Sequence, residues 1–345
     1  MKKTGERINV GVIGVGGWGK NLARNYSQIP GACLRYICDL DHAKLEAIQA
    51  QVQAEKVTND FDELLADDEL HGVIVATTAP SHYRLCKDAL LAGKDVFVEK
   101  PFVLTVKEAR ELVQLSEERG RVLMIGHLLE YHPVVNRLKE LVDSGELGEI
   151  RYIYSQRLNL GTVRMDENAL WNFAPHDISV ILYLLGELPK DIAARGQSYL
   201  QEGIEDVVFL SLNFSGSVMA HVHVSWLDPH KVRRLTIVGS KRMAVFDDLQ
   251  PTEKLRIYDK GAEVNTDYDT FAEYIGLRFG DICIPHIRVG EPLRHECEHF
   301  LDCVRTRKMP VSDGRDGLRV VQVLEAAGQS LESNGMPIVL GSQEN

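Results

Sequence analysis

The sequence has few of the features that mark secreted, membrane or nucleic-acid-binding proteins. Its six cysteines form no C-x-x-C pair, and no run of about 18 apolar residues occurs, so neither a disulfide framework nor a transmembrane helix is expected. The charged opening MKKTGERINV lacks the apolar core of a secretion signal. Acidic residues outnumber basic ones by 50 to 39, which disfavours general binding to nucleic acid or to anionic membranes. We therefore expect a cytoplasmic protein with reduced cysteines.

What is present fits a globular enzyme of ordinary composition. Hydrophobic residues make up 44% of the chain and charged residues 26%. A chain of 345 residues is long for one hydrophobic core, so two domains are expected.

A glycine-rich stretch near the start has the spacing of a dinucleotide-binding unit. The apolar run 10–13 is followed by Gly14, Gly16 and Gly19 in G-x-G-x-x-G spacing, then by a helical pattern and a second apolar run that ends in Asp39. This order of strand, glycine turn, helix, strand and acid predicts a βαβ unit that binds a dinucleotide. An unliganded turn of the same kind is the alternative.

Each of these residues has a physical reason to be there. Gly14 permits a tight turn, Gly16 lets backbone N–H groups approach a pyrophosphate, and Gly19 lets the helix pack close to the strand. The Asp39 carboxylate can hold a ribose 2′-hydroxyl. Because Asp41 and no arginine or lysine directly follows, a 2′-phosphate would be repelled, which favours NAD over NADP.

Apolar runs alternate with helical segments up to about residue 125. The expected strands are 72–76, 95–98 and 122–125, and the expected helices are 43–52, 60–65, 81–92 and 106–119. Such alternation predicts a parallel sheet with helices on both faces. Ligands bind at the carboxyl ends of such strands, where Thr77, Thr78, Glu99 and Lys100 lie.

The pattern changes from about residue 150. Strands are expected at 150–160, 191–199, 207–214, 218–226, 233–238 and 254–258, with a helix at 175–185 covering one face of the sheet. Two helices, 292–307 and 314–333, could pack back on the first domain. The expected fold class is α/β, with a doubly wound Rossmann domain (residues 1–124) and an α+β domain (residues 125–345) that contains a large, mostly antiparallel, open sheet.

Two segments carry a family resemblance. AGKDVFVEKP and the preceding TTAPSHYRLCKDALLAGK resemble the Gfo/Idh/MocA family of NAD(P)-dependent sugar and polyol dehydrogenases, in which strand five ends in Glu-Lys-Pro. The resemblance covers nearly the whole chain. Over residues 156–179 and 233–248 the chain is similar to the branch that oxidises nucleotide-linked sugars at C3, especially UDP-N-acetylglucosaminuronic acid 3-dehydrogenases of bacterial surface-polysaccharide (lipopolysaccharide) pathways.

The resemblance and the glycine pattern together predict the site. The expected cofactor is NAD, and no metal is expected. The residues expected at the cofactor are Gly14, Gly16, Gly17, Trp18, Gly19, Asp39, Thr77, Thr78, His82, Glu99 and Lys100.

Oxidation of a secondary alcohol needs a base for the hydroxyl proton. Lys100 is expected to be this base, because burial and the neighbouring charge of oxidised nicotinamide would both lower its pKa. A surface lysine that closes a strand is the structural alternative. His176 is expected to assist from the N-terminus of a helix that begins at Pro175. In relatives an aspartate precedes this histidine by four residues, but here Asn172 stands there, which can orient the ring yet adds no charge. A helix cap is the alternative role for Asn172.

Two arginines precede the expected helix. Arg157 and Arg164 flank Asn159, and their guanidinium groups suit the carboxylate or diphosphate of a sugar nucleotide. Trp171 is expected in the same substrate site. The run Lys231, Arg233 and Arg234 is given no site.

Other histidines suggest rival functions. Residues 295–299 read HECEH, a match to the zinc-peptidase signature, but both histidines are expected to point away from the apolar face of their helix. His221 and His223 share one face of a strand, which is expected to be solvated or interfacial. His127, Tyr131 and His132 could line the substrate pocket or form a packed aromatic cluster.

The sequence therefore predicts an NAD-dependent enzyme that oxidises C3 of a UDP-linked N-acetylated hexuronic acid. A dehydrogenase of a free polyol or sugar and a 3-ketoreductase of a nucleotide sugar remain alternatives, with a zinc peptidase and a non-catalytic NAD sensor behind them. A homodimer or homotetramer is expected, mainly from the resemblance.

Overall fold

A computed structural model describes residues 7–165, 167–264 and 275–341. Asp166, within the segment that suggested the branch, lies outside these ranges. The chain divides into two compact units, each described here by itself. The first consists of Met1–Tyr131 and Gly290–Gln322, and the second of His132–Val289 and Val323–Asn345. The cofactor and its binding turn were predicted within the first of these units.

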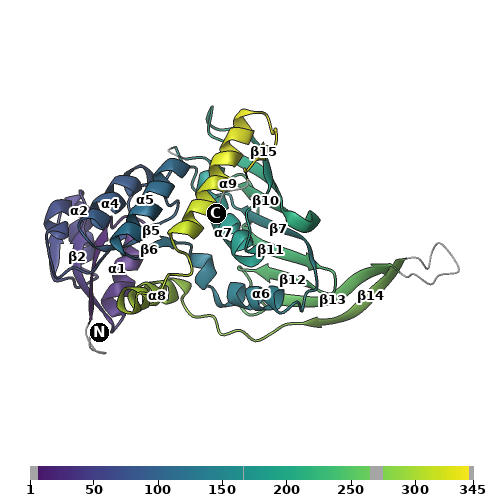
Figure 1. The fold of residues 1–345 in the computed structure, drawn as a ribbon, viewed down its shortest axis with the longest axis horizontal. Helices are drawn as coiled ribbons and strands as arrows, with labels where there is room; N and C mark the ends of the chain where they lie inside the picture. The colour runs from purple at the N-terminus through teal and green to yellow at the C-terminus, as the bar shows by residue number, and fades with distance from the viewer. Residues whose placement is uncertain (1–6, 166, 265–274, 342–345) are drawn as a thin grey trace. The chain divides into compact units, whose positions relative to one another are not determined.

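The first unit is built on a six-stranded parallel sheet with strand order β3-β2-β1-β4-β5-β6 (Figure 1). The strands are β1 (Ile8–Ile13), β2 (Ala32–Cys38), β3 (Lys56–Thr58), β4 (Gly72–Val75), β5 (Asp95–Glu99) and β6 (Leu123–Gly126). The parallel sheet expected from the alternating pattern is confirmed. Only the short strand β3 was not predicted.

Helices cover both faces of this sheet. They are α1 (Gly19–Gln28), α2 (His42–Gln49), α3 (Phe61–Leu65), α4 (Ala79–Leu91), α5 (Val106–Arg119), the short 3₁₀ helix η1 (Leu128–Tyr131) and α8 (Pro292–Thr306). Buried side chains of α1, α2 and α8 share one core, and those of α3, α4 and α5 share the other. The C-terminal segment thus completes the first unit, with Phe300 of α8 packing at 5.8 Å from the ring of Phe97.

Local signals explain why the helices begin and end where they do. Thr105 caps α5 by accepting a hydrogen bond from the backbone of Glu108, and Gly120 ends the helix in the left-handed conformation. The predicted range 106–119 is therefore confirmed.

The second unit contains a nine-stranded sheet with strand order β14-β13-β12-β11-β7-β10-β9-β8-β15. The strands are β7 (Ile150–Leu158), β8 (Asp191–Gln197), β9 (Val207–Asn213), β10 (Met219–Ser225), β11 (Val232–Gly239), β12 (Met243–Asp247), β13 (Leu255–Val264), β14 (Ile275–Cys283) and β15 (Ile338–Val339). Neighbouring strands are antiparallel except β7 and β10, which run parallel. The large, mostly antiparallel sheet is confirmed.

The helices of the second unit are α6 (Pro133–Asp143), α7 (Ala169–Leu185) and the 3₁₀ turn η2 (Ser215–Ser217). The helix α9 (Gly314–Glu332) begins in the first unit and ends in the second. α7 packs on β7, β9 and β10, as expected for the helix that covers the sheet. Among the described residues no helix is long and apolar enough to cross a membrane.

The predicted start of α7 at Pro175 was wrong. Asn168 caps the helix, since its side chain accepts a hydrogen bond from the backbone of Trp171 at 3.1 Å, and Pro175 lies inside the helix. The capping group upstream outweighs the preference of proline for the first turn. His176 therefore lies in the body of the helix and not at its N-terminus, as the sequence had suggested.

Candidate active site

The glycine turn joins β1 to α1. Gly14 has a φ of +85°, and a Cβ there would lie 2.8 Å from the carbonyl oxygen of Ala76. A Cβ on Gly19 would collide with the carbonyl oxygen of Gly14. At Gly16 and Gly17, by contrast, no atom lies within 4 Å of an added Cβ. The first and third glycines thus serve the turn itself, whereas the second faces open space where a pyrophosphate would fit.

Asp39 directly follows β2 and lies against this turn. Its Oδ2 accepts a hydrogen bond from the backbone of Val15 at 2.8 Å, and its Oδ1 accepts one from the backbone of Asp41 at 3.0 Å. Each carboxylate oxygen has a second lone pair, so the side chain can still accept from a ribose hydroxyl. The placement fits the dinucleotide that the sequence predicted.

The end of β4 leads into α4 through Thr77 and Thr78. The Thr77 hydroxyl lies 2.7 Å from the Ser81 hydroxyl, and Thr78 is exposed at the N-cap of α4. His82 is 1% exposed, with its ring nitrogens 2.9 Å from the carbonyl oxygen of Pro101 and 3.1 Å from that of Thr77. Burial lowers the pKa of His82, so the neutral ring donates to one of these carbonyls at a time. His82 thus supports two strand ends, and its contact with a cofactor stays a prediction.

Trp18 connects the glycine turn to the end of β5. Its indole N–H donates to Oε1 of Glu99 at 2.6 Å. The Trp18 side chain is partly exposed, but Glu99 is buried. Burial raises the pKa of Glu99 to about 7, although the Lys100 charge and the Trp18 hydrogen bond both favour the ionised form.

Lys100 follows Glu99 at the carboxyl end of the strand. It is half-buried, and its peptide bond to Pro101 is cis. Lys100 is the first residue after β5, and its charge is close enough to Glu99 to favour the ionised carboxylate. The structure therefore puts the predicted base at a ligand-binding edge of the sheet, next to the residue that holds the glycine turn.

Behind Glu99 lies a cluster of buried ionisable side chains that sequence reasoning did not find. Nδ1 of His127 lies 2.8 Å from Oδ2 of Asp316 and 3.4 Å from Oε1 of Glu130. Glu296, on α8, is fully buried, and neither of its carboxylate oxygens has a hydrogen-bond partner in the described part of the chain. The cluster adjoins the strand end, because Glu99 interacts electrostatically with both His127 and Glu296.

Burial and mutual contact shift the pKa values of these groups. Burial alone would lower the pKa of His127, but the hydrogen bond to Asp316 and the nearby carboxyl group of Glu130 outweigh it and raise the pKa to about 9. Burial and the nearby Asp316 carboxylate raise the pKa of Glu130, and burial raises that of Glu296. His127 is therefore a cation at neutral pH that faces one ionised and one protonated carboxyl group.

The predicted substrate residues lie in the second unit. Arg157 of β7 pairs with Asp177 of α7, with Nε 2.6 Å from Oδ2, and its side chain is only 12% exposed. Two guanidinium nitrogens contact Asp177, so Arg157 fastens the helix to the sheet. Its contact with a substrate stays a prediction. Asn159 and Trp171 are half-buried.

The loop before α7 joins two more predicted residues. Arg164 Nε lies 3.0 Å from Oε1 of Glu167, and the Asn172 side-chain amide donates to the same oxygen at 2.5 Å. The indole N–H of Trp226 donates to Oδ1 of Asn172 at 3.4 Å. The alternative role of Asn172 as a helix cap is wrong, since Asn168 is the cap.

The structure does not support a zinc site in the HECEH segment. His295 is exposed, whereas the Glu296 side chain is buried inside the first unit. His299 is half-buried, packs on the ring of Tyr131 and accepts a hydrogen bond from the backbone of Val311 at 3.1 Å. The prediction that His299 points away from the packed face was therefore wrong. Within the described ranges, the one group with metal-ligand spacing is His127, Glu130 and Asp316, which includes neither histidine of the motif.

The remaining histidines have structural partners. His221 and His223 share a face of β10, and the ring of His223 stacks on Phe209 at 4.2 Å. The Tyr131 hydroxyl lies 2.8 Å from that of Ser312, and His132 caps α6 through the backbone of Val134. These contacts favour the packed interpretation over a substrate pocket.

Comparison with known protein families identifies the family of this chain. Residues 8–127 match the oxidoreductase family model described as GFO_IDH_MocA, NAD-binding Rossmann fold, and residues 135–245 match the GFO/IDH/MocA C-terminal domain. The chain belongs to the Gfo/Idh/MocA oxidoreductase family. Members of this family include a UDP-N-acetylglucosamine 3-dehydrogenase and a scyllo-inositol 2-dehydrogenase.

Three Gfo/Idh/MocA relatives illustrate the range. The UDP-N-acetylglucosamine 3-dehydrogenase of Acidithiobacillus ferrooxidans is 28% identical over 91% of this chain and 94% of its own. A solved structure of that enzyme superposes with a TM-score of 0.79, covering 95% of this chain and 98% of the other at 26% identity. GenD2 from gentamicin A biosynthesis, solved with NAD, has a TM-score of 0.82 at 25% identity, covering 98% and 97%. The scyllo-inositol 2-dehydrogenase of Bacillus subtilis is 24% identical over 97% of this chain and 96% of its own.

Several residues of this Gfo/Idh/MocA site were missed from the sequence. Glu130 and Asp316 carry no local signal of burial. Glu296, in contrast, lies three residues after Leu293 and four before Phe300, so its position on the apolar face of the helix would have indicated that it is buried. The position of Asn168 directly before an apolar helical run is a capping signal that would have located the start of α7.

Proposed function

We propose that the protein is an NAD-dependent dehydrogenase that oxidises the C3 hydroxyl of a nucleotide-linked sugar, with UDP-N-acetylglucosaminuronic acid as the leading candidate. The observation that carries the proposal is the placement of Lys100 at the end of β5, directly after Glu99, which is hydrogen-bonded to Trp18 of the glycine turn. A lysine beside a dinucleotide turn is where an alcohol dehydrogenase needs a base.

NAD fits the first unit better than NADP does. The space beside Gly16 admits a pyrophosphate, and the Asp39 carboxylate accepts ribose hydroxyls while repelling a 2′-phosphate. When bound, NAD supplies the acceptor for the hydride of the substrate carbinol. The chain itself supplies the rest: it holds the dinucleotide, orients the sugar and takes the hydroxyl proton.

In this proposal Lys100 Nζ accepts the proton of the C3 hydroxyl. His176, assisted by Asn172, orients that hydroxyl or relays its proton. The cofactor site of the first unit is shaped by residues that the sequence predicted there: Gly14, Gly17, Gly19, Thr77, Thr78 and His82. Holding the base at the correct distance from the substrate hydroxyl accounts for much of the rate enhancement of such a step.

The substrate class is supported by the relatives and by the charge of the second unit. The A. ferrooxidans relative acts on UDP-N-acetylglucosamine at C3, as its name states. Arg164 is half-exposed, so its guanidinium group can still reach an anionic sugar, with Arg157, Asn159 and Trp171 nearby in sequence. A carboxylate on the sugar would match that arginine.

The test is NADH formation by the purified protein with NAD and a panel of alcohols. The panel contains UDP-N-acetylglucosaminuronate, UDP-N-acetylglucosamine, myo-inositol and glucose. We expect oxidation of the UDP-sugars, and faster oxidation of the uronate. Activity on the free polyol or sugar alone would overturn the substrate class but not the enzyme class, and would support the alternative suggested by the inositol dehydrogenase relative.

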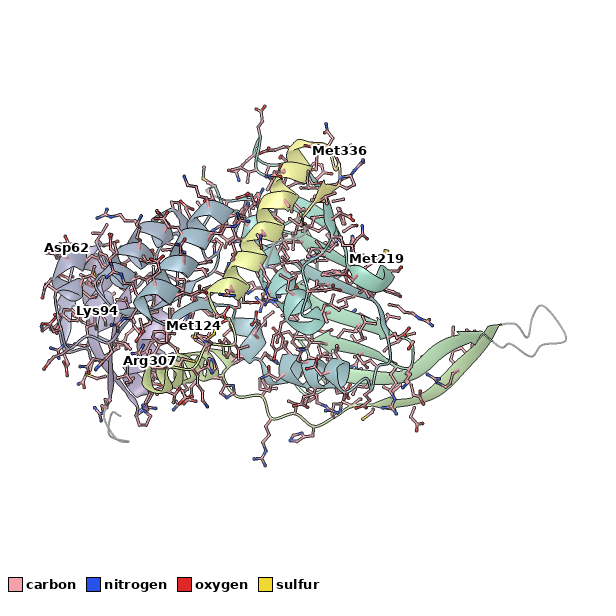
Figure 2. The ribbon with its side chains drawn as sticks, in the orientation of Figure 1. Asp62, Lys94, Met124, Met219, Arg307 and Met336 are labelled. Atoms are coloured by element: carbon pink, nitrogen blue, oxygen red, sulfur yellow. The ribbon has the colours of Figure 1, made fainter. Side chains whose placement is uncertain are left out.

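The outer face of the nine-stranded sheet supports a homo-oligomer. Four large side chains on the neighbouring strands β7, β9 and β10 are between 37% and 57% exposed: Tyr152, Tyr154, Phe209 and Met219. Of these, Met219 is labelled in Figure 2. An exposed aromatic face of this kind marks an interaction surface. We propose that it pairs with a second copy in a dimer or tetramer. The cytoplasmic location stays a prediction.

A further inference from the structure

The second unit holds a carboxylate, that of Glu167, to which no role was assigned from the sequence. Glu167 precedes α7, and its side chain is only 16% exposed. One of its oxygens, Oε1, accepts from Asn172 at 2.5 Å and from Arg164 at 3.0 Å. Because this carboxylate is largely screened from water, its negative charge acts mainly on the two groups that donate to it.

The Asn172 amide is fixed at both ends. Its nitrogen donates to Glu167, and its oxygen accepts from the indole N–H of Trp226, which is fully buried. This network also fixes which end of the amide is oxygen. His176 follows four residues later in the same helix, so both side chains lie on one face. Of the two ends of the Asn172 amide, only the oxygen is an acceptor, so it is the atom to which a ring N–H of His176 can donate.

We propose that Glu167 is a positioning residue that supplies, through the Asn172 amide, the negative charge that stabilises the protonated form of His176. The inference rests on the proposed function, in which His176 handles the substrate proton. When His176 gains a proton on its outer ring nitrogen, its inner N–H donates to Asn172. The polarised amide then carries the influence of the Glu167 carboxylate to the ring.

This arrangement resolves the difficulty that Asn172 raised. Asparagine adds no charge of its own. The Glu167 charge lies one amide farther from the His176 ring than an aspartate at position 172 would, so its effect on the ring is smaller. The competing explanation is structural: an acid just before a helix interacts favourably with the helix N-terminus. That explanation predicts a change in stability on removing Glu167 but no change in the titration of His176.

The first experiment follows His176 by NMR in the full-length protein labelled at histidine ring carbons, with its signal assigned by His176→Gln. We expect Glu167→Gln to lower the titration midpoint of His176 by about one pH unit. Glu205→Gln is the matched control. The Glu205 carboxylate accepts from Asn168 at 2.6 Å at the same helix end, so its loss removes the same charge but not the link to Asn172.

The second experiment moves the charge. Asn172→Asp in the Glu167→Gln background places a carboxylate next to His176, and we expect it to restore the midpoint and the pH profile of kcat. The same substitution in the wild type puts two carboxylates at the 2.5 Å contact, so we expect it to lower thermal stability. Rescue in one background and damage in the other is a pattern that a purely structural role would not produce.

An unchanged midpoint in Glu167→Gln, or an equal shift in Glu205→Gln, would overturn the inference. Because the NMR titration needs no substrate, its outcome is separate from that of the alcohol panel. If the sugars are oxidised but the midpoint does not move, the inference fails and the proposed function stands. If the midpoint moves but no alcohol is oxidised, the coupling stands and the proposed function fails.

Discussion

The indole N–H of Trp18 donates a 2.6 Å hydrogen bond to the buried carboxylate of Glu99. Trp18 belongs to the glycine turn, and Glu99 directly precedes Lys100, so one bond ties the dinucleotide turn to the strand end that carries the proposed base. Since burial raises the pKa of Glu99 to about 7, the strength of this bond changes with pH in the neutral range.

Removal of the Glu99 carboxylate should loosen the glycine turn. We expect Glu99→Ala to raise the dissociation constant for NAD about tenfold, because a charged acceptor contributes roughly 1.5–3 kcal/mol to a hydrogen bond. Glu99→Gln retains an acceptor and should raise it less. Calorimetric titration with NAD measures both, with exposed Glu118→Ala as the control. Equal affinity for NAD in Glu99→Ala and the wild type would show that the Trp18–Glu99 hydrogen bond does not contribute to cofactor binding.

Alanine substitutions should separate the glycines by role. At Gly19 an added methyl group collides with the backbone of Gly14, so we expect Gly19→Ala to cost about 3 kcal/mol and to lower Tm by several degrees. At Gly16 the space is open, so Gly16→Ala should leave Tm unchanged while weakening NAD binding. Differential scanning calorimetry and NAD titration distinguish the two. A fall in Tm for Gly16→Ala would show that the turn itself needs this glycine.

Lys100 should matter for turnover rather than for cofactor binding. We expect Lys100→Ala to reduce kcat by about 10²–10⁴-fold, the usual contribution of a positioned base, with NAD affinity near normal. Lys107→Ala, at an exposed position of α5, is the matched control. Single-turnover rates of NADH formation measure the effect, and comparable rates in Lys100→Ala and the wild type would exclude the lysine from the mechanism.

The buried cluster should make stability depend on pH. The folded protein holds the His127 proton up to about pH 9, whereas the unfolded chain releases it near 6.5. This contribution to stability is complete below pH 6.5 and is lost as the pH rises to 9. The raised pKa of Glu130 acts in the same direction. We therefore expect the free energy of unfolding to fall between pH 6.5 and 9, as measured by urea denaturation.

Glu130→Gln provides the matched test of that pH dependence. Glutamine mimics the protonated acid without its titration, so we expect a flatter pH profile and higher stability than the wild type near pH 9. Below about pH 4.5, where Glu130 is protonated in both the folded and the unfolded chain, the two proteins should be alike within about 0.5 kcal/mol. A steeper profile in Glu130→Gln would mean that Glu130 is ionised in the folded protein.

The exposed sheet face should control assembly. We expect Phe209→Glu to dissociate the oligomer, because it places a charge in the middle of the aromatic face. Met309→Glu, which also changes an exposed apolar residue but lies in the first unit, should leave the assembly intact. Sedimentation velocity gives the mass of each. A monomeric wild type would contradict the proposed pairing.

The sequence predicted most of the first unit because its signals are local. Glycine spacing, strand periodicity and the caps of α5 act within a few residues of where they occur, and they placed Gly14, Asp39 and Lys100 correctly at the ends of their strands. The strands β12, β14 and β15 were missed, because a short or solvated strand is defined by its neighbours in the sheet rather than by its own pattern.

The contacts of the site were less predictable. The cluster of His127, Glu130, Glu296 and Asp316 brings together residues separated by up to 189 positions in the chain. Glu130 and Asp316, taken alone, are typical of a solvated helix face. The position of Glu296 on an apolar helix face and that of His127 after β6 indicate burial but not which side chains they contact. Likewise, Arg157 was expected at a substrate, but nothing in its own neighbourhood of the sequence indicates that Asp177 would contact it first. Pairing over such separations depends on tertiary structure, which periodicity does not encode.

The first unit is discontinuous in sequence, and this affects how the chain can fold during synthesis. Its core contains Leu293, Cys297 and Phe300 of α8, which pack on the sheet formed by residues 8–126. A nascent chain that has emerged only as far as Tyr131 exposes that apolar surface to solvent until the end of α8, about 175 residues further along, has been made. The first unit thus begins to be translated first but cannot complete its core until most of the second unit has been made.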